Sequence, residues 1–271
     1  MTVEQTHGNL HSTTPSRSLD NYHIDVATDD RLVAFFDIDN TLYSASSRIS
    51  EAMGTRIHAY FLTLGISDKE ASELHHEYYT LYGLALRGLT RHHDVDPLDF
   101  DLKCDGSLPL EEMIQPDPPL RKLFQDINRS KVRVWALTNA YRTHAQRVLK
   151  ILDLEDQIDG LIYCDYAEPN FTCKPEAEYY RRALKKANVK DPAKCLFIDD
   201  SLTNVKGAIR EGWGRCVHFR ETGLNAMEGG KMKEIGSDKD LVTDDSNGQG
   251  TIVAVSDLQQ LREVWPDIFE K

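Results

Sequence analysis

The chain has 271 residues, of which 40% are hydrophobic and 28% charged, so it is long enough to bury a sizeable core. These values exclude a wholly disordered chain and a collagen-like repeat. Its 32 basic and 44 acidic residues give a net charge of −12. This charge argues against binding to a nucleic-acid polymer or an anionic membrane, because neutralising their phosphates requires a basic face. A small phosphate ester remains compatible with it.

The ends of the chain and its cysteines indicate a reducing compartment. Residues 1–29 are rich in Thr, Ser, His and Asp, lack apolar periodicity, and predict a flexible tail. They also lack the apolar segment of a signal peptide, and no run approaches the roughly 18 apolar residues of a membrane-spanning helix. Five cysteines without a CxxC pair argue against a disulfide framework or a structural zinc site. We therefore expect a cytoplasmic location, with the nucleus also compatible.

Short apolar runs separated by helical stretches predict the strands of a parallel sheet, buried on both faces. The first such run, LVAFF, ends in acidic residues, and a later one, CLFI, does the same. The predicted strands are 32–36, 132–137, 161–164, 195–198, 216–219 and 251–255, and the predicted helices are 120–128, 142–152, 176–187, 203–211 and 257–264.

One stretch interrupts this alternation. Apolar residues between Ile49 and Leu64 repeat at helical spacing, and Ser67 with Glu70 predicts the capping box of a second helix. Residues 222–250, rich in Gly, Ser and Asp, predict a long surface loop, to which we assign no role. The expected organisation is a tail (1–29), a sheet domain (30–45 and 119–271) and an inserted helical domain (46–118).

Polar residues follow four of the predicted strands, and ligands bind at the carboxyl ends of strands in open parallel sheets. Taken singly, each cluster has a plain structural interpretation as a turn, a helix cap or a solvated lysine. Their combination at the ends of successive strands favours function instead. The clusters are Asp37 with Asp39, Thr138 with Asn139, Lys174 before Pro175, and Asp199 with Asp200.

The residue types in these clusters suit phosphate chemistry. A pair of carboxylates two residues apart can supply one group for attack and one for proton transfer. Asp199 and Asp200 offer oxygen ligands for a hard cation such as Mg²⁺. Converging carboxylates repel each other, and a cation together with Lys174 would relieve that repulsion. Phosphate oxygens would then match the cation, Lys174 and the Thr138 hydroxyl.

The same residues resemble the four signature motifs of the haloacid dehalogenase-like (HAD) superfamily of phosphotransferases, over about residues 31 to 220. The resemblance implies an α/β fold, with a Rossmann-like parallel-sheet core and an inserted α-helical (type 1) cap. Further segments resemble the fungal and plant branch of pyrimidine 5′-nucleotidases. The superfamily motifs are DIDNTL, TN, KP and FIDDS, and the branch segments are YGLALRGL, LTNAYRTHAQRVLK, YCDY and FIDDSLTNVKGAIREGW.

The resemblance implies a role for each motif residue. Asp37 would be the nucleophile that forms an aspartyl-phosphate, and Asp39 the acid and base. Thr138, the Asn139 backbone N–H and Lys174 would hold phosphoryl oxygens. Thr41 would orient the first motif, and Ser201 and Asn204 would support the site. The implied Mg²⁺ ligands are Asp37, the backbone carbonyl of Asp39 and Asp200, with Asp199 acting through a metal-bound water or exchanging roles with Asp200.

The resemblance further implies Mg²⁺-dependent hydrolysis of nucleoside 5′-monophosphates, with UMP and CMP favoured. Asp39 favours a phosphatase over a dehalogenase, since an alkoxide leaving group needs a proton and a halide does not. The alternatives are another small phosphomonoester (a sugar phosphate, phosphoglycolate, nicotinamide mononucleotide or lysophosphatidate), a mutase, and a non-catalytic regulatory module with this fold. We expect no nucleic-acid polymer or membrane as partner, and the sequence indicates no protein partner.

The insertion would close over the site and contact the substrate. Its tyrosines more often pack helices together than touch a ligand, whereas an arginine between apolar neighbours is a better candidate. His144 and Arg147, one turn apart after the second motif, would reach the insertion or form surface pairs. The candidates for substrate binding in the insertion are Arg56, Tyr82 and Arg87, with His58, Tyr78 and Tyr79 also considered.

Overall fold

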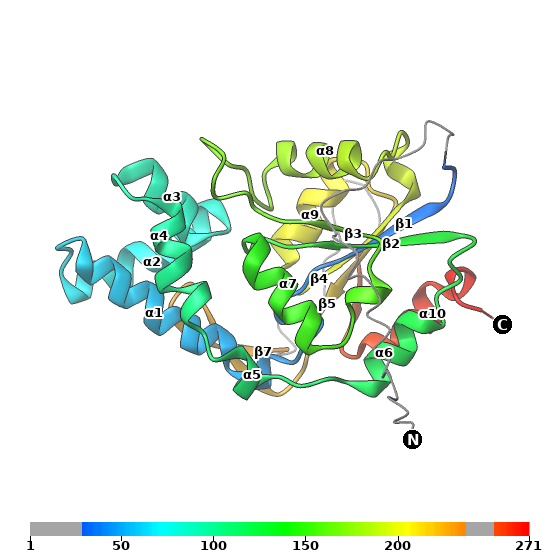
Figure 1. Ribbon diagram of the computed structural model, residues 1–271, viewed down its shortest axis with the longest axis horizontal. Coiled ribbons are helices and arrows are strands. Elements are labelled where there is room, and N and C mark those ends of the chain that lie inside the picture. The colour runs from blue at the N-terminus through cyan, green and yellow to red at the C-terminus, as the bar shows by residue number, and fades with distance from the viewer. Residues whose placement is uncertain (1–28, 237–251, 271) are drawn as a thin grey trace, which may run out of the picture.

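The computed structural model describes residues 29–236 and 252–270, and its centre is a six-stranded sheet in which every neighbouring pair is parallel. The strand order is β3-β2-β1-β4-β5-β8 (Figure 1). The first strand therefore lies in the middle, paired with β2 on one side and β4 on the other. The strands are β1 (Leu32–Phe36), β2 (Val132–Leu137), β3 (Gly160–Ile162), β4 (Cys195–Asp199), β5 (Arg215–Phe219) and β8 (Val253–Val255).

Helices cover both faces of the sheet, which explains why its strands are apolar throughout. Alternate residues of β1 enter different cores: Phe36 packs against Phe124 on one face, and Phe35 packs against Trp213 on the other. One face carries α6 (Pro118–Gln125), α7 (Arg142–Ile151) and α10 (Leu261–Val264), and the other carries α8 (Ala177–Lys186) and α9 (Leu202–Arg210) (Figure 1). The expected α/β fold is confirmed.

The segment between β1 and α6 is helical, and none of its residues, all of which the structure describes, forms a strand. As predicted, the Ser67 side chain caps the second helix by accepting a hydrogen bond from the Glu70 backbone N–H. Tyr78 packs inside this helical group, where its hydroxyl contacts His93. The helices are η1 (Ala45–Ser47), α1 (Ile49–Thr63), α2 (Asp68–Tyr82), α3 (Ala85–His92), α4 (Pro97–Lys103), η2 (Asp105–Ser107) and α5 (Leu110–Met113).

A β-hairpin occupies part of the segment for which the sequence predicted a surface loop. Strands β6 (Leu224–Glu228) and β7 (Lys231–Ile235) pair antiparallel across Gly229 and Gly230, which both have positive φ. That conformation suits the two-residue turns that twist with the strands they join. The prediction of a loop is therefore wrong for residues 224–235, because β6 packs against η1 and α1 and buries Ala226. Residues 237–251 lie outside the described residues, as do residues 1–28 of the predicted tail.

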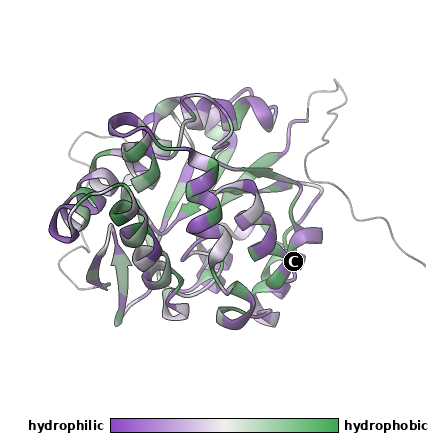
Figure 2. Ribbon diagram, turned by 60° about the vertical axis from the view of Figure 1, so that its left-hand side comes forward, coloured by the Kyte–Doolittle hydropathy of each residue, from purple (hydrophilic) through white to green (hydrophobic). Residues whose placement is uncertain are grey.

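The distribution of hydrophobic residues follows this layering. Figure 2 shows hydrophobic strands inside the molecule and helices with hydrophilic outer faces. No helix within residues 29–236 and 252–270 combines the length and the apolar character needed to cross a membrane.

Candidate active site

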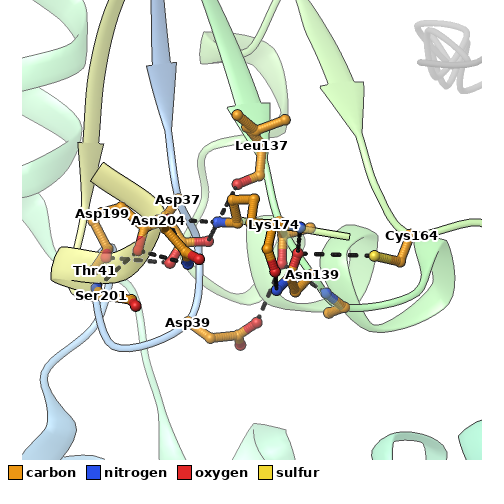
Figure 3. A network of polar contacts seen from close by, with 12 residues as sticks. Asp37, Asp39, Thr41, Leu137, Asn139, Cys164, Lys174, Asp199, Ser201 and Asn204 are labelled. Atoms are coloured by element: carbon orange, nitrogen blue, oxygen red, sulfur yellow. Dashed lines mark hydrogen bonds and ion pairs between the residues drawn. The ribbon is translucent and has the colours of Figure 1, made fainter. Parts of the chain in front are cut away.

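The polar clusters that follow the strands meet at the carboxyl edge of the sheet, with Lys174 at their centre (Figure 3). The Lys174 ammonium lies 2.6 Å from Asp37 Oδ1, 2.6 Å from Asp199 Oδ2 and 2.8 Å from the Leu137 carbonyl oxygen. These three acceptors match the three N–H donors of an ammonium group. The side chain is 1% exposed, so its partners replace the solvent that it loses.

The turn after β1 places Asp37 beside Lys174. The backbone N–H of Asp37 still bonds to the Ile198 carbonyl, 3.0 Å away, which continues the pairing of β1 with β4. The chain then turns through Asn40, which has φ 54°, and the Leu42 N–H closes the turn onto Ile38. Asp37 is therefore held at the end of a buried strand rather than on a mobile loop.

The Asn139 side chain fixes the segment that carries the lysine. Its Nδ2 donates to the Lys174 carbonyl at 2.9 Å, and its Oδ1 accepts from the Lys174 backbone N–H at 2.7 Å. The two bonds join the segment after β3 to the end of β2. The motif pointed only to the backbone N–H of Asn139, because tertiary structure decides the partner of a side-chain amide.

The two adjacent acids after β4 face different surroundings. Asp199 is fully buried and accepts hydrogen bonds from the Ser201 N–H at 2.8 Å, from Asn204 Nδ2 at 3.0 Å and from Lys174. Asp200 instead lines the cavity in front of the sheet, while its backbone carbonyl accepts from His218. The structure thus separates a carboxylate saturated by protein donors from one that is free to meet a ligand.

Asp37, Asp199 and Asp200 form the group of acidic side chains best suited to a cation among the described residues. Their ligand oxygens lie within 4.8 Å of one another. Burial and the neighbouring Asp199 carboxylate raise the pKa of Asp37 to about 8, although Lys174 opposes the rise. Burial and the carboxylates of Asp199 and Asp37 raise the pKa of Asp200 well above its ordinary value. One lysine does not balance three carboxylates, so these hard oxygen donors fit a divalent cation such as Mg²⁺.

Asp39 lies apart from this group, at the wall of the cavity. Its Oδ1 accepts from the Tyr43 hydroxyl and from His144 Nε2, each at 2.7 Å, and its Oδ2 lies 3.4 Å from Thr138 Oγ1. Burial raises the pKa of Asp39, but the His144 charge and these hydrogen bonds outweigh it and lower that pKa below its ordinary value. Burial lowers the pKa of His144, yet the Asp39 carboxylate raises it to about 9. His144 therefore faces the active site and does not form a surface pair.

A cavity of about 240 Å³ lies between the sheet edge, the helical insertion and the β6–β7 hairpin. The sheet edge contributes the polar end, which Asp37, Asp39 and Lys174 line. The opposite end is largely apolar. It is lined by Ile49, Met53, Ile57, Phe100 and Met227, together with the polar side chains of Ser50, His75, Tyr79 and Glu228.

The three insertion residues expected to bind substrate do not line this cavity. Arg87 pairs with Glu176 at 2.7 Å. Arg56 bonds to Ser107 at 2.8 Å, and the Tyr82 hydroxyl bonds to His92 at 2.7 Å. Each polar head group has a local partner, which turns it away from the site. The structure therefore places Arg56, Tyr82 and Arg87 outside the lining of this cavity, while Tyr79, also considered, does line it.

Comparison with known proteins identifies the class. The family model of the haloacid dehalogenase-like hydrolases matches residues 32–212, a span that includes all four polar clusters. The chain therefore belongs to this family of hydrolases, and the expected membership is confirmed.

Individual relatives agree with this assignment. Phosphate metabolism protein 8 of Saccharomyces cerevisiae is 37% identical over 200 residues, which is 70% of this chain and 62% of that protein. The phosphorylated carbohydrates phosphatase of Thermotoga maritima is 26% identical over 124 residues, 45% of this chain and 56% of that protein. The chain thus spans less than two thirds of either relative. The HAD-hydrolase YfnB of Bacillus subtilis, solved with bound magnesium, shares the fold with a TM-score of 0.54, at 16% identity over 87% of this chain and 99% of that one.

Proposed function

We propose that this protein is a Mg²⁺-dependent phosphatase for small phosphomonoesters. The observation that carries the proposal is the position of Lys174, bonded to Asp37 and Asp199 at the polar end of a cavity that Asp39 and Asp200 also face. A nucleophilic carboxylate, a second carboxylate for proton transfer and a cation-binding group are what hydrolysis of a phosphate ester demands. The phosphatase named among its relatives supports the same activity.

In the proposed reaction, an oxygen of Asp37 attacks phosphorus in line and forms an aspartyl-phosphate while the bond to the leaving oxygen breaks. The proton for that oxygen comes through Asp39, whose carboxylate accepts a hydrogen bond from protonated His144, and Asp39 later takes a proton from the water that hydrolyses the intermediate. Thr138, the Asn139 backbone N–H and Lys174 hold the phosphoryl oxygens. Mg²⁺, held by Asp37, Asp200 and the Asp39 backbone carbonyl with Asp199 behind them, would offset the negative charge of the phosphoryl group.

For the substrate we propose nucleoside 5′-monophosphates, with UMP and CMP favoured. The support comes from the segments that resemble the pyrimidine 5′-nucleotidase branch and from a small cavity with an apolar far end. Its volume, about 240 Å³, lies just below the range for small-molecule sites, about 300–1,000 Å³, which favours a small substrate. We also propose a cytoplasmic location, which is supported by the five buried cysteines, none of which forms a disulfide.

The proposal is tested by measuring phosphate release from UMP, CMP, a sugar phosphate and 2-phosphoglycolate, with Mg²⁺ and with EDTA. Asp37→Asn keeps the size of the side chain but removes the nucleophile, so kcat should fall by at least about a thousand-fold. Asp94→Asn, which removes an exposed carboxylate of the insertion, is the matched control and should leave kcat unchanged. Equal activity of Asp37→Asn and the wild type would contradict the mechanism. A much higher kcat/KM for a sugar phosphate than for UMP would contradict only the substrate.

A further inference from the structure

The β6–β7 hairpin reaches from the sheet domain to the helical insertion and closes the far end of the cavity. The Met227 side chain lies against Gly54 of α1, and Gly229 lies so close to α2 that an added Cβ would be 2.9 Å from the Tyr79 Cβ. At Gly230 an added Cβ would be 2.7 Å from His75 Nδ1. The glycine turn therefore permits a contact with α2 that a larger residue would prevent.

Several polar groups at this end of the cavity lack a protein partner. His75 is 4% exposed and lines the cavity, yet its imidazole makes no hydrogen bond to any residue that the structure describes. The Tyr79 hydroxyl is likewise unpaired within the described part of the chain, and Ser50 Oγ is buried there without a partner. Because a buried hydroxyl is ordinarily hydrogen-bonded, Ser50 Oγ indicates a ligand that supplies the missing partner, and His75 and Tyr79 line the same cavity and can bond to that ligand.

The chemistry of these groups favours an uncharged ligand. Burial lowers the pKa of His75 to about 4, so at neutral pH its ring offers one donor and one acceptor. The hydroxyls of Tyr79 and Ser50 can also both donate and accept. Such a set matches hydroxyl groups, as on a ribose or another sugar.

The charges of the residues that line the cavity also favour an uncharged ligand. Of the residues that line the cavity, Lys174 is the sole lysine or arginine, and it sits at the phosphate end, bonded to two carboxylates. Glu228 lines the hairpin side, paired with Lys233 at 3.1 Å on the outer surface. Asp105 and Glu221 add further carboxylates to the lining. His144 is the other cation of this lining, and Asp39 is already bonded to it, so a leaving group with its own negative charge would meet carboxylates and no unpaired cation among these residues.

We propose that the hairpin completes the subsite for the leaving group and that Glu228 excludes leaving groups that carry a negative charge. His75, Tyr79 and Ser50 bind the hydroxyls of an uncharged leaving group. This inference rests on the proposed phosphatase activity and narrows its substrate class. Neutral nucleosides and sugars are accepted as leaving groups, and the glycolate of 2-phosphoglycolate is rejected.

The test compares kcat/KM for UMP and for 2-phosphoglycolate in the wild type, Glu228→Gln and Glu228→Lys. The wild type should prefer UMP, and Glu228→Lys should raise the relative kcat/KM for 2-phosphoglycolate roughly ten-fold, since it replaces repulsion by attraction. Glu228→Gln should give a smaller rise. The matched control is Glu234→Gln, which removes an exposed carboxylate of the same hairpin outside the cavity and should not change the ratio.

A second variant tests the hydroxyl contacts. Tyr79→Phe keeps the ring packed against Gly229 and removes only the hydroxyl, so KM for UMP should rise several-fold, the usual effect of one lost hydrogen bond. KM for methyl phosphate, whose leaving group carries no further hydroxyl to bind, should not change. An unchanged UMP to 2-phosphoglycolate ratio in Glu228→Lys overturns the inference and leaves the proposed function intact. A wild type that hydrolyses no phosphomonoester overturns the function, and the inference falls with it.

Discussion

At the scale of single residues, Lys174 shows how the site manages buried charge. An ion pair removed from water adds little net stability, because desolvation offsets the attraction. Lys174 nevertheless lies between Asp37 and Asp199, at 2.6 Å from each. The ion pairs instead hold the Asp37 carboxylate in one position, as the proposed nucleophilic attack requires. The same lysine keeps the repulsion between neighbouring carboxylates tolerable until a cation binds.

His144 belongs to the same scale and leads to a prediction. Its contact with Asp39 fixes the carboxylate that would protonate the leaving oxygen. His144→Leu should therefore lower kcat for an alkyl phosphate such as UMP roughly a hundred-fold, the usual size of a general acid's contribution. Activity on p-nitrophenyl phosphate should fall much less, because nitrophenolate leaves without a proton.

Two variants make this prediction specific. His144→Gln places an amide donor near the position of Nε2 and should recover part of the lost kcat. Arg147→Gln, one turn along α7, removes only the surface pair with Glu111 and should behave as the wild type. Equal losses on both substrates in His144→Leu would show that His144 supports the structure and does not position Asp39.

At the scale of elements, the site depends on where strands end. β1, β2 and β4 each end in the polar residues that carry the proposed chemistry, and their parallel pairing brings these ends to one edge. The β6–β7 hairpin adds a wall that follows β5 in the chain yet packs against α1 (Ile49–Thr63), far earlier in the chain. Its turn is therefore a contact between the sheet domain and the insertion.

That contact predicts the effect of a single methyl group. Gly230→Ala would press on the His75 ring and also strain a residue with φ 74°, so it should displace the turn from α2. We expect KM for UMP to rise several-fold, with kcat for methyl phosphate nearly unchanged. Gly223→Ala is the control, because φ there is 73° and no atom lies within 4 Å of the added carbon. If both variants raise KM equally, backbone strain is the cause and the contact with α2 is not.

At the scale of the whole molecule, the sheet separates two hydrophobic cores, and Met53 of α1 packs against both of them. The carboxylate group lies at the sheet edge, between the β1 and β4 ends, and its repulsion opposes folding of the centre. A ligand that binds the native state alone stabilises the whole chain by mass action. The cation site should therefore influence global stability as well as activity.

Thermal unfolding with and without Mg²⁺ tests this expectation. At about a hundred times its dissociation constant, Mg²⁺ should add about 2.7 kcal/mol to the free energy of unfolding. For a chain of this size that corresponds to a rise in Tm of roughly 5 °C or more. The Asp200→Asn variant should lose most of the rise, whereas Asp94→Asn should keep it. A Tm that does not respond to Mg²⁺ in the wild type would contradict a cation site at these carboxylates.

The sequence alone determined the alternation of buried strands and helices, the helical insertion and the four polar clusters. Each of these features depends on residues that are close together in the chain, such as an apolar repeat or acids at the end of a strand. The Gly229-Gly230 pair between two short runs is also a hairpin signal in the sequence, although a loop was predicted there. The partners of long polar side chains could not be predicted from the sequence. Arg56, Tyr82 and Arg87 turn to Ser107, His92 and Glu176, while His144 turns to Asp39. Packing between distant segments chooses among such partners, so only the tertiary structure decides which polar groups face the cavity.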